Sequence, residues 1–93
     1  ERAYRLKPTD PAILDSLGWI YYRTGNLPDA EKYLQQALQA MPDAEIAAHL
    51  GEVLWMQGKR SEAREIWRQA LERQPDSTIL RSTMQRLIGS ENP

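Results

Sequence analysis

One pattern of residues occurs twice in the chain at a fixed interval, the one that separates Gly18 from Gly51. Seven positions recur at this same interval with the same or a similar side chain. The first set is Leu17, Gly18, Tyr21, Ala30, Leu34, Ala37 and Pro42, and the second is Leu50, Gly51, Leu54, Ala63, Trp67, Ala70 and Pro75. A period of about 20–50 residues indicates stacked copies of one supersecondary unit. Ala3 and Pro8 precede Ala37 and Pro42 by nearly the same interval, which predicts that residues 1–9 are the end of a preceding repeat.

Turn and capping residues divide each interval into two helices. Asp10 before Pro11 is typical of a helix start, because aspartate accepts hydrogen bonds from free N–H groups and proline loses none there. Gly25 and Gly58 are typical of helix ends. Apolar residues between these signals follow the helical period, and no segment alternates with period two. The sequence therefore predicts an all-α fold, with helices starting near Asp10, Pro28, Asp43, Ser61 and Ser77, the last ending at about Ile88.

Small residues recur where the two helices of a pair would cross. Gly18 with Ala30, and Gly51 with Ala63, are predicted to let the helices approach closely. Met84 follows Gly51 by the same interval that separates Gly51 from Gly18, so no second helix needs to pack tightly there. Nearby polar residues, Arg81, Gln85 and Arg86, are expected on an outer face. This combination is typical of a helix that caps a repeat array.

The whole pattern resembles the tetratricopeptide repeat (TPR), a helix–turn–helix unit that stacks into a solenoid. The resemblance rests on Leu14, Leu17, Gly18, Tyr21, Ala30, Ala37 and Pro42, and then on Leu50, Gly51, Ala63, Ala70 and Pro75. It implies repeats at residues 10–43 and 44–76, a capping helix at 77–88 and a tail at 89–93. Ala47, Leu54 and Trp67 depart from the family pattern, and Trp67 is still expected in the core because its position is a core position of the repeat.

Composition excludes several classes of function. The chain has 93 residues, no cysteine, one histidine and a net charge of −1, with both signs interspersed. Disulfides and thiolate metal sites are therefore impossible, and no basic patch suits nucleic acid or an anionic membrane. No catalytic constellation or phosphate loop is present in the sequence. We predict a non-enzymatic chain with no cofactor, no bound metal, no nucleic acid and no direct membrane contact.

The candidate binding site is one side of the first helix of each repeat. The resemblance implies that these helices line a concave groove, which suits a peptide or a partner helix. The candidate residues are Asp15, Trp19, Tyr22, His49, Glu52, Trp55 and Arg81. Their aromatic side chains are either anchors for a partner or ordinary packing between neighbouring helices. Asp15 and Glu52 are expected to favour a basic residue on the partner.

The leading functional hypothesis is the C-terminal part of a scaffold or adaptor that binds a polypeptide in this groove. The amino-acid sequence of residues 15–19 and 45–55 also resembles the closing repeats of bacterial envelope TPR lipoproteins. Some members of that group bring substrates to a carboxyl-terminal processing protease. That resemblance implies a periplasmic or outer-membrane-attached location, while the residues themselves leave a cytoplasmic one open. The alternative hypothesis is a structural module that caps a longer array, or that self-associates through its N-terminal end.

Overall fold

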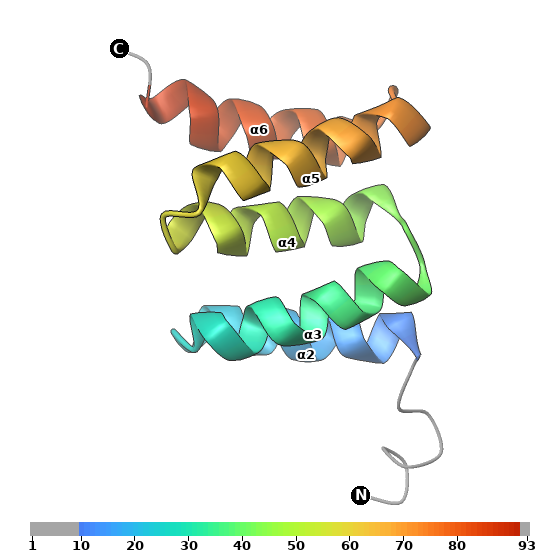
Figure 1. The fold of residues 1–93 in the computed structure, drawn as a ribbon, viewed down its shortest axis with the longest axis vertical. Coiled ribbons are helices and arrows are strands. Elements are labelled where there is room, and N and C mark those ends of the chain that lie inside the picture. The colour runs from blue at the N-terminus through green and yellow to red at the C-terminus, as the bar shows by residue number, and fades with distance from the viewer. Residues whose placement is uncertain (1–9, 92–93) are drawn as a thin grey trace, which may run out of the picture.

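The computed structural model describes residues 10–91, which form five α-helices and no strand (Figure 1). The helices are α2 (Pro11–Arg23), α3 (Leu27–Ala40), α4 (Ala44–Met56), α5 (Arg60–Arg73) and α6 (Thr78–Glu91). This confirms the predicted all-α fold class. The repeat end predicted at residues 1–9 lies outside the described residues.

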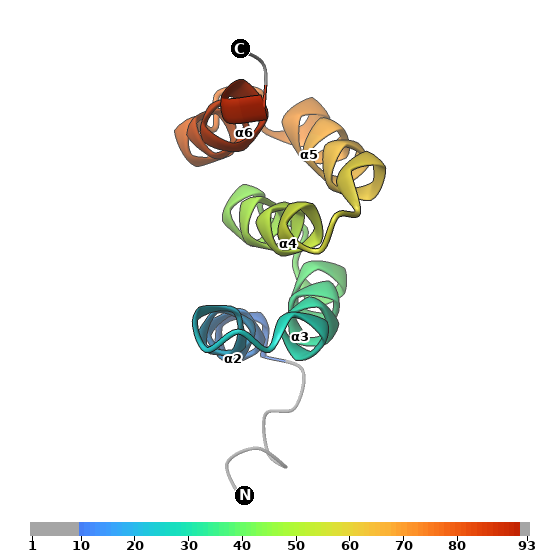
Figure 2. The ribbon, with the colours of Figure 1, turned by 90° about the vertical axis from the view of Figure 1, so that its left-hand side faces the viewer.

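The helices form two antiparallel pairs, α2 with α3 and α4 with α5, and α6 then packs on α4. Figure 2 shows that α2, α4 and α6 lie along one side of the molecule, while α3 and α5 lie along the other. Helix α4 is set back between α2 and α6, so these three helices form an arc. The result is an elongated stack measuring 49 × 28 × 18 Å.

The local signals act largely as predicted at the helix ends. The Asp10 side chain accepts a 2.9 Å hydrogen bond from the Ala12 N–H, and Asp43 does the same for Glu45. Gly25 and Gly58 follow α2 and α4 with positive φ angles of 88° and 86°, the conformation that favours glycine.

Two predicted helix ends are wrong. Helix α5 begins at Arg60, after Lys59, which makes no side-chain capping hydrogen bond, so Ser61 lies inside the first turn and is not the cap. Helix α6 continues through Gly89 to Glu91, past the predicted end at Ile88. A glycine inside a helix costs only about 1 kcal/mol relative to alanine, so Gly89 by itself does not stop α6.

The helix pairs pack as closely as the small residues predicted. A Cβ atom added to Gly18 would lie 2.6 Å from Leu34 Cγ, and one added to Gly51 would overlap the Trp67 indole ring. Trp67 is fully buried, which confirms its predicted core position. Among the described residues its Nε1–H has no hydrogen-bond partner. The indole ring of Trp67 therefore packs against Gly51 although its Nε1–H is left without a hydrogen bond, which costs free energy.

Helix α6 lies one residue out of the predicted register. Four residues, 74–77, connect α5 to α6, whereas three, 41–43, connect α3 to α4. Equivalent positions in α4 and α6 are therefore one residue further apart than those in α2 and α4, and each added residue turns a helix face by about 100°. Gln85, and not Met84, is the equivalent of Gly51; Gln85 is exposed, whereas Met84 packs against the core. The predicted equivalence of Met84 with Gly51 is wrong for this reason.

Candidate functional site

The candidate site is the concave face formed by α2, α4 and α6 (Figure 2). Its N-terminal part is a cluster of one carboxylate and two rings. Asp15 Oδ1 and His49 Nδ1 lie 2.9 Å apart, within hydrogen-bonding distance. The Trp19 ring stacks on the His49 ring with centroids 4.2 Å apart and an interplanar angle of 28°. His49 therefore joins α4 to α2 through both its polar edge and its face.

Tyr22 continues this cluster towards the C-terminal end of α2. Its ring centroid lies 4.9 Å from that of Trp19. Its hydroxyl donates a 2.8 Å hydrogen bond to Glu52 Oε2 on α4. The pKa of Tyr22 is raised from 10.0 to about 12. Burial is the largest cause, and the hydrogen bond to the Glu52 carboxylate is the next. The phenol is therefore held in its neutral, donating form.

Glu52 is the charged centre of the concave face. Glu52 is only 7% exposed. Burying a carboxylate costs folding free energy unless hydrogen-bond donors or positive charges compensate it. Arg86 on α6 provides the second donor, with Nη2 2.7 Å from Glu52 Oε1. The hydrogen bond to Glu52 is also the main reason that the pKa of Arg86 is raised. The side chains of Tyr22, Glu52 and Arg86 thus form a hydrogen-bond network that connects α2, α4 and α6.

The structure places Trp55 outside this cluster. Trp55 is 5% exposed and belongs to the core between α4 and α5. Its ring centroid lies 5.7 Å from that of Trp67, and the guanidinium groups of Arg60 and Arg64 lie over it at 4.8 Å and 5.3 Å. Of the two alternatives left open for Trp55, an anchor for a partner or packing within the fold, this burial favours packing, because its ring surface is already covered by α5.

Arg81 is also placed away from the predicted groove edge. Its Nε and Nη2 donate hydrogen bonds of 2.9 Å and 2.7 Å to the Pro75 carbonyl, so the side chain holds the α5–α6 connection. Arg86 takes the place beside Glu52 instead. The sequence interpretation put Arg86 on an outer polar face because it applied the interval between Gly18 and Gly51 to α6. The extra residue in the connection was the only signal that could have identified Arg86.

The internal pairs also change the expected chemistry of the groove. Asp15 is bonded to His49, and Glu52 to Tyr22 and Arg86. Both carboxylates are thus engaged within the chain, which weakens the expected preference for a basic residue of a partner, above all at the nearly buried Glu52. Within the described range, no group of His, Asp or Glu side chains could hold a metal ion, and no helix has the length and hydropathy to span a membrane.

The family profile described as "Tetratricopeptide repeat" matches residues 1–45 and 16–78. The chain belongs to the tetratricopeptide repeat family. Such repeats generally mediate protein–protein interaction, and tetratricopeptide repeat proteins are typically scaffolds without enzymatic activity.

Two relatives of this tetratricopeptide repeat chain illustrate its relation to longer proteins. It is 70% identical over 92 residues to the TPR repeat-containing protein PA4667 of Pseudomonas aeruginosa, covering 99% of this chain and 16% of that protein. It is 35% identical over 43 residues to the anaphase-promoting complex subunit CDC16 of Saccharomyces cerevisiae, covering 46% of this chain and 5% of that subunit. The chain thus spans only a small part of the length of either relative.

Proposed function

We propose that this tetratricopeptide repeat chain is a binding module, the C-terminal part of a scaffold or adaptor, whose concave face holds a polypeptide segment. The observation that carries the proposal is the position of Trp19. Its ring is partly exposed on the concave face and is held in place by His49 and Tyr22. A large aromatic ring that is already ordered loses little conformational entropy on binding, which makes it a suitable anchor.

The charges on this face favour an acidic partner segment. Asp15 and Glu52 are paired within the chain, whereas the Arg86 side chain remains 57% exposed after bonding to Glu52. A guanidinium group has five N–H donors, so Arg86 keeps donors for a partner. We therefore expect an extended or helical segment with an apolar side chain against Trp19 and a carboxylate near Arg86.

A finer proposal is an adaptor role in the bacterial envelope, in which the groove recruits substrates to a protease. It is supported by the resemblance of residues 15–19 and 45–55 to envelope TPR lipoproteins. The relative in Pseudomonas aeruginosa supports a bacterial setting. The competing function is structural, namely capping or self-association, and it is favoured by the exposed Ile13 and Ile20 on α2.

Binding through the concave face is tested with the chain carrying Trp19→Ala, Arg86→Gln or Lys32→Ala. Partners are captured from native bacterial extract, identified, and then titrated in purified form. Trp19→Ala should lower the affinity for the purified partner by about 30-fold or more, as expected when an anchor that contributes about 2 kcal/mol of binding free energy is removed. Arg86→Gln should weaken it less, and Lys32→Ala, on the exposed surface of α3, should leave it unchanged.

The control measurements separate binding from folding. Each variant is compared with the parent by circular dichroism and thermal unfolding before titration. Equal affinities for all three folded variants would remove the concave-face proposal. A loss of oligomeric state in Trp19→Ala, with no change in partner affinity, would favour the structural alternative.

A further inference from the structure

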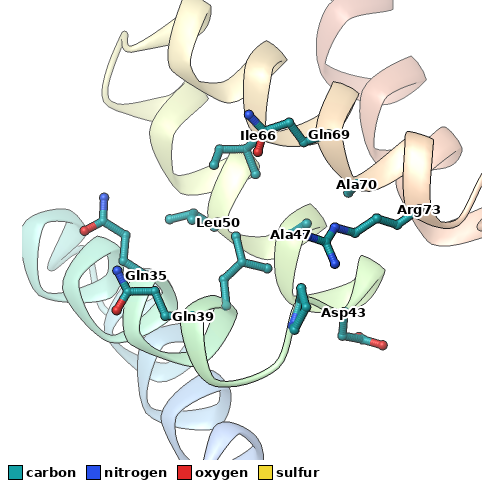
Figure 3. A pocket seen from close by; sticks show the side chains of 11 residues that line it. Gln35, Gln39, Asp43, Ala47, Leu50, Ile66, Gln69, Ala70 and Arg73 are labelled. Carbon is teal, nitrogen blue, oxygen red and sulfur yellow. The ribbon is translucent and has the colours of Figure 1, made fainter.

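A cleft lies on the side of the molecule away from the concave face. It runs between α3 and α5 with α4 as its floor, and its volume is about 450 Å³ (Figure 3). On α4 it is lined by Ala47 and Leu50, whereas His49 and Glu52 belong to the concave face. Successive residues of a helix are about 100° apart, which places these two pairs on different sides of α4. The cleft is therefore separate from the proposed groove.

At two positions that line the cleft, the second helix pair carries smaller side chains than the first pair does. Where the first pair has Leu14 and Tyr33, the second has Ala47 and Ile66 at the equivalent positions of the repeat. Leu14 is buried, and the Tyr33 ring stacks on a neighbouring tyrosine ring. Ala47 and Ile66 occupy less volume and both line the cleft. The second pair thus has less side-chain volume at these two positions than the first pair has.

The walls of the cleft combine apolar surface with hydrogen-bonding amides. Leu38 on α3 and Ile66 on α5 are both partly exposed and line it from opposite sides. Gln35 and Gln39 extend from α3 at its rim, as Figure 3 shows. Amide side chains both donate and accept hydrogen bonds, which suits the backbone of an extended peptide. The apolar walls suit one side chain of that peptide.

The cleft is lined by one acidic and one basic side chain, Asp43 and Arg73. Asp43 lies at one end, but its carboxylate already accepts the Glu45 N–H at the start of α4. Arg73 reaches into the cleft from α5 (Figure 3) and forms no ion pair or hydrogen bond with another described residue. A guanidinium group in this position favours a carboxylate, with which it can form two parallel hydrogen bonds.

From these observations we propose that the cleft between α3 and α5 is a second binding site, which takes an extended acidic peptide segment. One branched or aromatic side chain of the segment enters between Leu38 and Ile66. A neighbouring carboxylate pairs with Arg73, and the glutamine amides of α3 bond the peptide backbone. The concave face would remain free, so the chain could hold two partner segments at once.

The proposal is tested by NMR titration of the ¹⁵N-labelled chain with short capped peptides. The probe is a pentapeptide with a central leucine between two glutamates and a glycine at each end. Saturable shift changes are expected at the amides of Leu38, Ile66 and Arg73. A peptide with a central alanine should bind more weakly, and one with lysines in place of the glutamates should bind more weakly still. Shift changes confined to Trp19 and His49, or equal binding of the lysine peptide, would overturn the proposal.

Two variants test the residues themselves. Ile66→Ala should weaken the glutamate–leucine peptide by about tenfold, because it removes apolar contact area. Arg73→Gln should weaken it by about threefold, the size of an exposed ion pair, and should abolish the preference over the lysine peptide. Gln36→Ala, on the exposed surface of α3 outside this cleft, serves as the matched control. Since Arg73 is exposed, its variant decides the outcome even if Ile66→Ala is destabilised. Unchanged affinity in Arg73→Gln would refute the acidic specificity.

Discussion

At the scale of single residues, the concave face is defined by how its buried charge is compensated. Glu52 is held between the Tyr22 hydroxyl and the Arg86 guanidinium, which come from helices on either side of α4. Either donor alone would leave a nearly buried carboxylate short of partners. The same contacts that stack α2, α4 and α6 therefore set the electrostatics of the surface that a partner would meet.

The Tyr22 hydroxyl should titrate above the usual pH range of a tyrosine. Its pKa is raised to about 12, so the native state keeps this proton more strongly than the unfolded state does. The associated stability is fully present below about pH 10 and is lost as the pH rises from about 10 to 12. We expect a late component in the tyrosinate absorbance titration that Tyr22→Phe removes and Glu52→Gln moves to lower pH. A wild-type titration with no component above pH 11 would contradict the hydrogen bond to Glu52.

At the scale of helices, the pairs are organised by two glycines at their crossings. A Cβ at Gly51 would overlap the Trp67 ring, whereas a Cβ at Gly89 on α6 would meet no atom within 4 Å. Gly51 and Gly89 are thus both helical but have different surroundings. Gly51 is required by the close approach of a second helix, whereas alanine at position 89 would improve helix propensity.

Gly51→Ala and Gly89→Ala should therefore change stability in opposite directions. Gly51→Ala should lower the free energy of unfolding by about 1–3 kcal/mol, because the indole ring must move within a packed core. Gly89→Ala should raise it by up to about 1 kcal/mol. Urea denaturation followed by circular dichroism measures both values. Equal stability of Gly51→Ala and the parent would argue against the close crossing of α4 and α5.

At the scale of the whole molecule, burial depends on whether a preceding helix pair is present. Ile20 on α2 is 58% exposed, yet its equivalent Val53 on α4 is 0% exposed because it packs within the stack. Ile13 and Ile46 differ in the same sense. The outer side of α2 thus presents apolar residues that the repeat pattern normally covers, and we propose that it is the surface through which the isolated chain self-associates.

Self-association through α2 is expected to depend on protein concentration and on Ile20. Sedimentation equilibrium of the 93-residue chain should show an increase in mass with concentration, and Ile20→Glu should reduce it by placing a charge in the contact. Met56→Glu, at a comparably exposed apolar residue on α4, should leave the association unchanged. A strictly monomeric parent, or equal effects of both variants, would contradict this role of α2.

Features that are local or periodic could be predicted from the amino-acid sequence. The interval between Gly18 and Gly51 predicted the helix pairs and their close crossings, since both depend on helical geometry and side-chain size. The caps at Asp10 and Asp43 were predictable because the bonded N–H lies only two residues away. The same interval brought Asp15, Trp19, Tyr22, His49 and Glu52 to one face, where the structure finds them in contact.

The sequence did not show which side chains already have a partner within the fold, or which face of a helix meets its neighbour. One additional residue before α6 turned Arg86, and not Arg81, towards Glu52, and the interval between the two glycines could not indicate this. Trp55 looked equivalent to Tyr22, but the α5 residues that cover its ring lie beyond a turn. The cleft at Ala47 likewise depends on volumes contributed by three helices. Register and packing couple residues far apart in the chain, and for that reason they had to be seen in the folded molecule.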